Sequence, residues 1–177
     1  MKPAEAVELI RDAVPRPGGT WADLGAGDGT FTRALAALLG PDSHLYAIDR
    51  DARALATLAR WAKTANAGVT VATADFAKPF AAPWPGPLDG MLFANALHFV
   101  RDGGQVLGRL AAHLRPGGRV VLIEYDRRAA NPWVPHPIPI SALPALAAAA
   151  GLGVPKVLAT RPSRYGGDLY VAVTDRP

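Results

Sequence analysis

Strand-like and helix-like periods alternate along the whole chain, and this alternation limits the fold more than any other feature of the sequence. Short apolar runs such as Leu88–Ala94 and Val120–Ile123 have the character of strands covered on both faces. Between such runs, apolar residues recur at the spacing of a helix face, as in Phe31, Leu35 and Leu38. The pattern predicts a parallel sheet with right-handed crossovers and helices on both faces.

The strands expected from this reading end in a hairpin. They lie at Thr20–Leu24, His44–Ile48, Val69–Thr73, Leu88–Ala94, Val120–Ile123, Lys156–Thr160 and Asp168–Thr174. The last two are joined only by Arg161–Gly167, which is too short for a crossover, so that pair is predicted to be antiparallel. The chain has 177 residues and no long linker, so residues 1–177 are expected to form a single domain.

Helix boundaries are read from capping and breaking residues. Ser141 is predicted to cap the last helix and Gly151 to end it. The helix before the fifth strand is expected to stop at the turn Arg115-Pro116-Gly117-Gly118.

Composition removes several classes of protein. The chain has no cysteine, which excludes disulfides and thiolate metal sites, and its 4 histidines show no short metal-binding spacing, so no metal is predicted. Met1–Val14 has no apolar run of the kind that marks an export signal, and no stretch approaches a membrane span, so a cytoplasmic protein is expected. A net charge of +4, spread over scattered arginines, disfavours nucleic acid as a partner.

A glycine-rich segment joins the first predicted strand to the next helix. It reads Asp23-Leu-Gly-Ala-Gly-Asp-Gly29. A dinucleotide fingerprint needs glycine where Thr30 stands, and the Gly-Lys-Ser/Thr of a phosphate loop is absent. The Asp23 carboxylate would repel a pyrophosphate but pair with an ammonium group. S-adenosylmethionine carries such a group and no phosphate.

This segment resembles the first motif of the class I S-adenosylmethionine-dependent methyltransferases, and the resemblance extends over nearly the whole chain. It implies that Asp23 helps to hold the methionine amino group of the cofactor, while Gly25, Ala26, Gly27 and Gly29 approach it.

Four further segments resemble motifs of the same family, in the family's order. Tyr46-Ala-Ile-Asp49 implies that Asp49 accepts both ribose hydroxyls and that Arg50 lies against the adenine. Ala74-Asp75-Phe76 implies that Asp75 accepts the adenine amino hydrogen and that Phe76 offers a ring face. Asp89–Val100 implies that Asn95 faces the methionine part of the cofactor through its main chain and that His98 lies near the mouth of the site. Leu114–Glu124 resembles the turn into the fifth strand.

The resemblance also implies the architecture. The expected fold is α/β, a three-layer αβα Rossmann-like sandwich. Its seven-stranded sheet is mostly parallel, has the order 3-2-1-4-5-7-6, and contains one antiparallel strand, strand 7.

Each of these residues also has a purely structural interpretation. Asp49 could cap the following helix, Asp75 could begin a loop, and Phe76 could belong to the core. His98 could be a packed, hydrogen-bonded core histidine. In the proline-rich loop Asn131–Pro139, Trp133 and His136 could line a pocket, although pinning of the loop is preferred for both.

The predicted reaction is an in-line transfer of the cofactor's methyl group to a small-molecule acceptor. The mechanism needs alignment, plus a general base if the nucleophile carries a proton. His98, Glu124 and Tyr125 are the candidates, in that order. The fourth-strand segment is most similar to small-molecule methylases of the quinone-biosynthesis type.

The connection Tyr125–Ile140 is the segment expected to choose the substrate. Its Arg127 and Arg128 favour an anionic acceptor. Because no large insert covers the pocket, either it is open to a large partner or a second subunit of a homodimer covers it. Two other classes of function stay open at this point, an NAD(P)-dependent oxidoreductase and a non-catalytic S-adenosylmethionine-binding interaction module.

Overall fold

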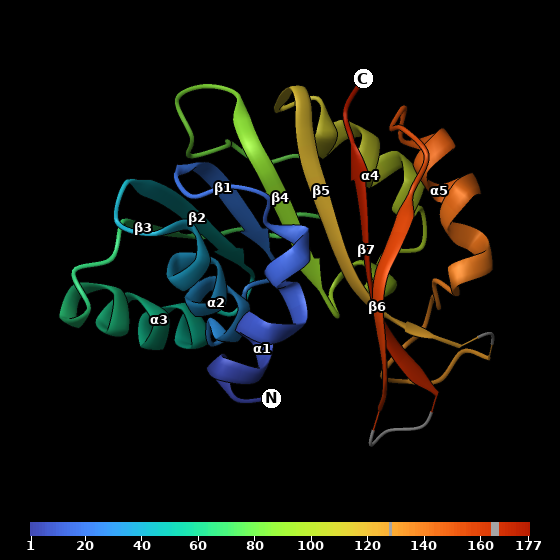
Figure 1. Ribbon diagram of the computed structural model, residues 1–177, viewed down its shortest axis with the longest axis horizontal. Coiled ribbons are helices and arrows are strands. Elements are labelled where there is room, and N and C mark those ends of the chain that lie inside the picture. The colour runs from blue at the N-terminus through green and yellow to red at the C-terminus, as the bar shows by residue number, and fades with distance from the viewer. Residues whose placement is uncertain (128, 164–166) are drawn as a thin grey trace.

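One seven-stranded sheet runs through the molecule in the order β3-β2-β1-β4-β5-β7-β6 (Figure 1). The computed structural model describes residues 1–127, 129–163 and 167–177. Strands β1 to β5 pair in parallel, and β7 runs antiparallel to both β5 and β6. The predicted fold class, strand order and antiparallel strand are confirmed.

The elements alternate as the periodicity predicts. The strands are β1 (Gly19–Leu24), β2 (Ser43–Asp49), β3 (Val69–Thr73), β4 (Leu88–Ala94), β5 (Leu114–Asp126), β6 (Lys156–Pro162) and β7 (Asp168–Asp175). The α-helices are α1 (Pro3–Ile10), α2 (Thr30–Leu39), α3 (Ala52–Thr64), α4 (Gly103–Ala111) and α5 (Leu143–Ala149), and short 3-10 turns η1, η2 and η3 cover Arg11–Ala13, Leu97–Phe99 and Ile140–Ala142. No helix within the described residues is long and apolar enough to span a bilayer.

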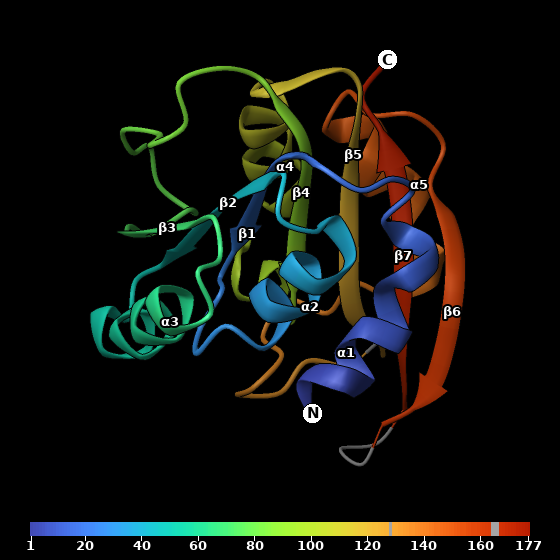
Figure 2. The same ribbon diagram turned by 60° about the vertical axis from the view of Figure 1, so that its left-hand side comes forward.

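Helices cover both faces of the sheet, with α1 to α3 on one face and α4 and α5 on the other (Figure 2). Leu35 of α2 packs with Ile10 of α1 and with Leu92 of β4 in one buried cluster. On the opposite face, Leu107 of α4 and Leu143 of α5 pack against the sheet in a second cluster. Central strands buried on both faces explain the apolar runs in the sequence.

Two predicted boundaries are wrong. Residues Arg115–Gly118 do not stop a helix but belong to β5, because the backbone of this segment finds partners. Gly117 donates to the carbonyl of Arg176, and the β4–β5 register shifts between Leu88 and Gly90 to absorb the irregularity.

Ser141 does not cap the last helix either. It is exposed within η3, and the residue before α5 is Ala142, which provides no side-chain cap. Gly151 follows that helix with φ +67°, a left-handed conformation that suits a helix end, as predicted.

The parallel strands end together at the lower edge of the sheet in Figure 1, and this edge positions the site. The loops after β1, β2, β3, β4 and β5 all begin there. In an open α/β sheet, ligands bind outside the carboxyl ends of the strands.

Gly90 of β4 leaves the space that the Trp21 ring of β1 fills. A Cβ atom at position 90 would lie 2.4 Å from Cζ3 of Trp21. We therefore predict that Gly90→Ala lowers the free energy of unfolding by about 1–3 kcal/mol through overpacking. Urea denaturation measures it. Gly86→Ala is the control, because a Cβ there meets nothing within 4 Å; equal stabilities for the two variants would contradict the prediction.

Candidate functional site

Three adjoining cavities lie at the carboxyl ends of the parallel strands. The glycine cavity, of about 450 Å³, is lined by Gly25 and Asp49 among others. The smaller Asp23 cavity is lined by Asp23, the buried acid one residue before the end of β1. The Trp133 cavity, of about 660 Å³, lies between His98 and Trp133. The site is therefore built from the loops after five strands.

Asn95, the first residue after β4, lines all three cavities. Its φ of +51° is a left-handed conformation that asparagine tolerates better than most residues. Its main-chain N–H donates to the carbonyl of Ile123 at 2.8 Å, whereas its side-chain Oδ1 is buried without a hydrogen-bond partner among the described residues. Of these two groups of Asn95, the side-chain oxygen rather than the main-chain N–H is therefore without a partner among the described residues where the three cavities meet.

The glycines after β1 serve different purposes. A Cβ at Gly25 would lie 2.6 Å from the Cβ of Ala96, and one at Gly29 would lie 2.3 Å from Leu58, so both are required by packing. Gly27 has φ +55° and open space where a Cβ would stand. Here the bare backbone faces the glycine cavity. Ala26 is buried between these glycines and lines the Asp23 cavity.

Asp49 joins two loops through its carboxylate. Oδ2 accepts from the N–H of Gly27 at 2.8 Å, and Oδ1 accepts from the N–H of Asp51 at 2.8 Å. The interpretation of Asp49 as the cap of α3 is wrong. Asp51 is the cap, because its side chain accepts from the N–H groups of Arg53 and Ala54. A carboxylate has about four lone-pair sites, so Asp49 keeps acceptor capacity toward the cavity.

The predicted adenine residues gather along one wall of the glycine cavity. Arg50, Asp75 and Phe76 all line it. Asp75 also begins a loop, since its Oδ1 accepts from the N–H of Ala77 at 3.0 Å. Phe76 also packs edge-on against the core residue Phe93, with ring centroids 5.7 Å apart. Asp75 therefore begins a loop and Phe76 packs against the core, as their structural interpretations predict. Both residues also line the glycine cavity.

Asp23 is a buried acid with too few partners. It is 1% exposed, Thr32 donates to its Oδ2 at 2.6 Å, and its Oδ1 has no partner among the described residues. Burial raises the pKa of Asp23 to about 7, the Thr32 hydrogen bond lowers it, and the charge of Asp49 raises it further. A cationic ligand in the Asp23 cavity would relieve this cost.

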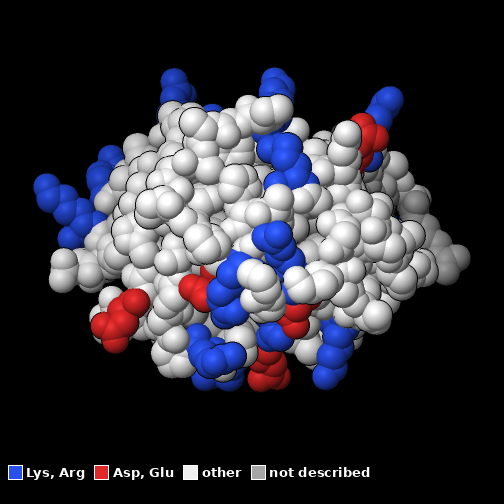
Figure 3. Space-filling view, turned by 90° about the horizontal axis from the view of Figure 1, so that it is seen from above, with Lys and Arg blue, Asp and Glu red and all other residues white. Residues whose placement is uncertain are grey.

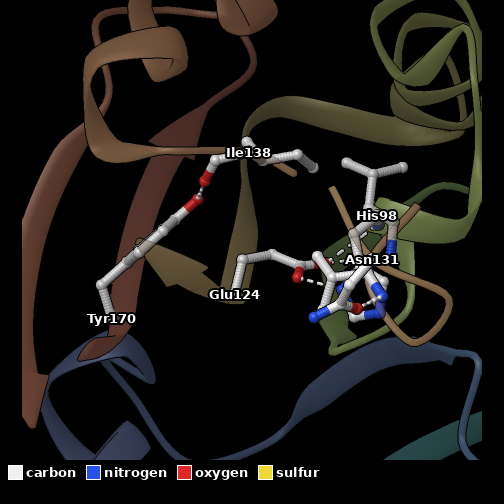
Figure 4. Close-up of polar contacts among 7 residues, drawn as sticks. His98, Glu124, Asn131, Ile138 and Tyr170 are labelled. Carbon is white, nitrogen blue, oxygen red and sulfur yellow. Dashed lines mark hydrogen bonds and ion pairs between the residues drawn. The ribbon is translucent and has the colours of Figure 1, made fainter. Parts of the chain in front are cut away.

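His98 and Glu124 form a buried pair between β4 and β5 (Figure 4). Nδ1 of His98 lies 2.5 Å from Oε2 of Glu124, while Oε1 accepts from the N–H groups of Leu97 and His98. A neutral His98 that faces an ionised Glu124 donates through Nδ1, because an ionised carboxylate only accepts, and Nε2 is then the acceptor of the ring. His98 lines the Trp133 cavity.

Glu124 is 0% exposed and surrounded by donors from the turn after β4. Its carboxylate is therefore engaged by this turn and by the ring of His98. Tyr125, the third candidate base, lines the Trp133 cavity, and its ring centroid lies 6.2 Å from that of His98.

The connection after β5 is pinned by its polar groups. Oδ1 of Asn131 accepts from the N–H groups of Trp133 and Val134, and the N–H of His136 donates to the carbonyl of His98. Tyr170 donates its hydroxyl to the carbonyl of Ile138 (Figure 4).

The pinning role preferred for Trp133 is therefore wrong. Its side chain is 76% exposed and lines the cavity, while the backbone and Asn131 hold the loop. Arg127 also lines this cavity, and Arg128 lies outside the described residues.

Sequence reasoning missed Phe99 and Asn131. Phe99 lines both the glycine cavity and the Trp133 cavity and is 51% exposed. Its signal was an aromatic residue in the turn after a buried strand and beside a candidate site histidine. The side chain of Asn131 begins a turn two residues before Trp133, and an asparagine at the start of a proline-rich loop is a recognisable turn signal.

Comparisons with known proteins agree with this geometry. A family model described as "Methyltransferase domain" matches residues 22–120. A 52-residue segment is 42% identical to Ribosomal RNA small subunit methyltransferase H from Verminephrobacter eiseniae. This match covers 29% of the chain and spans only 16% of the length of that relative.

Several solved structures share the fold. The YcgJ protein from Bacillus subtilis has a TM-score of 0.77 at 12% identity over 98% of each chain. A SAM-dependent methyltransferase from Aquifex aeolicus has a TM-score of 0.70 at 16% identity, again over 98% of each chain. CrArsM, an arsenic(III) S-adenosylmethionine methyltransferase from Chlamydomonas reinhardtii, has a TM-score of 0.72 at 17% identity, over 90% of this chain and 63% of the other.

Asp23 should make stability depend on pH. Its pKa rises from 3.8 to about 7 on folding, so the folded protein binds the extra proton between these values. The stability that this proton contributes is present below pH 3.8 and is lost as pH rises through about 7. We predict that wild type loses free energy of unfolding relative to Asp23→Asn, on the order of 4 kcal/mol across this window.

Urea unfolding at a series of pH values measures the difference between the two proteins. Asp42→Asn, in an exposed loop, is the control for removal of one carboxylate. A difference between wild type and Asp23→Asn that stays constant from pH 4 to 8 would refute the role of burial.

Proposed function

The chain belongs to the methyltransferase-domain family, and we propose that it transfers the methyl group of S-adenosylmethionine to a small-molecule acceptor. S-adenosylmethionine is the cofactor that this family membership and the named structural relatives imply. The observation that carries the proposal is the meeting of three cavities at Asn95. Cofactor and acceptor can approach each other only at such a junction. The family match favours this reaction over an NAD(P)-dependent oxidoreductase.

The glycine cavity fits the adenosine part of the cofactor. Asp49 keeps free acceptor sites beside the backbone of Gly27, which suits the two ribose hydroxyls as hydrogen-bond donors. Phe76 and Arg50 offer flat groups to a purine, and Asp75 offers an acceptor to its amino group. These contacts support the roles assigned to these residues.

The Asp23 cavity fits the methionine part. Two buried oxygens, Oδ1 of Asp23 and Oδ1 of Asn95, have no hydrogen-bond donor among the described residues, and both residues line this cavity. An α-ammonium group supplies three donors and a positive charge, which is what two such acceptors require. These two unpartnered acceptors support a cationic hydrogen-bond donor as the ligand of this cavity.

The chemistry asks little of the protein beyond alignment and proton removal. The sulfonium of the bound cofactor supplies a methyl group that is already activated. His98 contacts the acceptor and takes its proton on Nε2, since Nδ1 is committed to Glu124. Glu124 acts as a positioning residue that fixes the tautomer of His98. Tyr125 forms part of the cavity wall.

Two observations support a small acceptor. The Trp133 cavity, at about 660 Å³, falls within the range of small-molecule sites. Figure 3 looks onto the other end of the sheet, where basic side chains form a broken line with acidic groups beside it. At that end, Arg115 is paired with Asp89, and Arg119 with Asp175, so these cations lie away from the cavities and are partly neutralised.

We also propose that residues 1–177 act as one domain, because one sheet provides the walls of all three cavities. The expectation that a second subunit covers the exposed Trp133 cavity stays a prediction, which the sedimentation of the protein tests.

Removal of the Asp49 carboxylate should weaken the binding of cofactor. Asp49→Ala leaves two ribose hydroxyls without their acceptor, so we predict a loss of about 1–3 kcal/mol in affinity for S-adenosylhomocysteine. Isothermal calorimetry measures it. Asp49→Asn, which keeps one acceptor oxygen, should lose less, and Asp42→Ala serves as a remote control. Unchanged affinity in Asp49→Ala would remove this residue from the site.

Substitution of His98 should separate chemistry from cofactor binding. With labelled S-adenosylmethionine and a metabolite extract, we predict that label enters a small-molecule fraction that passes a size filter. His98→Ala should reduce this transfer by about 100-fold or more, and S-adenosylhomocysteine affinity should stay the same. Label found only in RNA or protein fractions would overturn the small-molecule proposal, and no transfer to any fraction would favour a non-catalytic binding module.

A further inference from the structure

Arg127 has no ion-pair partner among the described residues. It follows β5 and lines the Trp133 cavity, and its Nε is buried without a hydrogen-bond partner among the described residues. Asp126, its neighbour in the chain, accepts instead from the N–H of Ile140. An unsatisfied buried donor lowers stability, and a carboxylate would satisfy a guanidinium with two parallel hydrogen bonds.

Aromatic rings line the same cavity as this cation. Phe99 and Trp133 are 51% and 76% exposed, although side chains of this size are usually packed away from water. Both line the Trp133 cavity, as does Tyr125. The centroid of the His98 ring lies 4.4 Å from that of Phe99. Such walls favour a flat, apolar ring as the occupant.

The buried pair of His98 and Glu124 limits which group of the acceptor can be the nucleophile. Glu124 holds His98 in the tautomer that leaves Nε2 as a proton acceptor. A base of this kind contributes only when the nucleophile has a proton to give up. An acceptor with a hydroxyl on an aromatic ring would place its nucleophile against the base and its ring against the aromatic walls. An anionic group on the same ring would reach the cation.

We propose that the acceptor is an aromatic hydroxy acid whose carboxylate is bound by Arg127 and whose hydroxyl lies against His98. This inference rests on the function proposed above and names its substrate class. In the step, the hydroxyl proton passes to Nε2 of His98, and the oxygen forms a bond to the methyl carbon. The bond from that carbon to sulfur breaks, and its electron pair stays on sulfur, so S-adenosylhomocysteine leaves.

The test compares acids with their neutral isosteres. The 2-, 3- and 4-hydroxybenzoates and the corresponding hydroxybenzamides are titrated into the full chain saturated with S-adenosylhomocysteine. At least one acid should bind about 10- to 100-fold tighter than its amide, as expected for one charge-assisted pair. Arg127→Met should remove this preference, and Arg127→Lys should restore part of it. The preferred acid should also yield its methoxybenzoate when S-adenosylmethionine replaces the product.

A matched variant separates local from general charge effects. Arg60→Met removes one positive charge from the exposed side of α3 and should leave the preference for the acid intact. Unchanged S-adenosylhomocysteine affinity in Arg127→Met shows that this variant is folded.

The two proposals fail in different ways. Equal binding of every acid and its amide, no binding of either, or a preference that survives Arg127→Met would overturn the inference about the acceptor. Failure of the wild-type chain to bind S-adenosylhomocysteine would instead overturn the proposed function.

Discussion

Two acidic side chains, each at the end of one strand, hold the loop that follows the neighbouring strand. Asp49 at the end of β2 binds the N–H of Gly27 in the loop after β1. Glu124 near the end of β5 binds the N–H groups of Leu97 and His98 in the turn after β4. Because parallel neighbours end at the same edge, a carboxylate on one strand reaches the free N–H groups beyond the other. The site depends on this cross-strand arrangement.

Three acids of the site, Asp23, Asp49 and Glu124, differ in how well their charge is compensated. Glu124 receives three hydrogen bonds and Asp49 receives two from backbone groups. Asp23 receives one, from Thr32, and burial raises its pKa to about 7. An acid that is poorly satisfied in the free protein lowers stability, and a cationic ligand recovers what is lost. Stability and ligand binding are thus opposed at the end of β1.

Much of the fold could be predicted from the sequence because it follows from local patterns. Alternating periods indicate the layers, and Asp23–Gly29 indicates where the ligand-binding edge begins. The helix-cap predictions fail where several residues close together in the chain could each precede the same helix. Asp51 rather than Asp49 caps α3, and Ser141 caps nothing because the chain enters α5 through a 3-10 turn. Such choices depend on backbone angles that residue types do not determine.

The contact between His98 and Glu124 lies beyond sequence reasoning for another reason. The two residues are 26 positions apart, and they meet because Ala94 pairs with Ile123 in the β4–β5 register. A shift of the register by one residue would turn Glu124 to the other face. The sequence named both residues as separate candidates, but only the register makes them one pair.

Phe99 and Asn95 are common walls of the glycine cavity and the Trp133 cavity, and this has a thermodynamic consequence. A molecule seated in one cavity completes the surface that the other presents, so the two equilibria are linked. By linkage, if the first ligand changes the affinity for the second by some factor, the second ligand changes the affinity for the first by the same factor. A protein with shared walls therefore responds to the concentrations of its two ligands jointly rather than to each one alone.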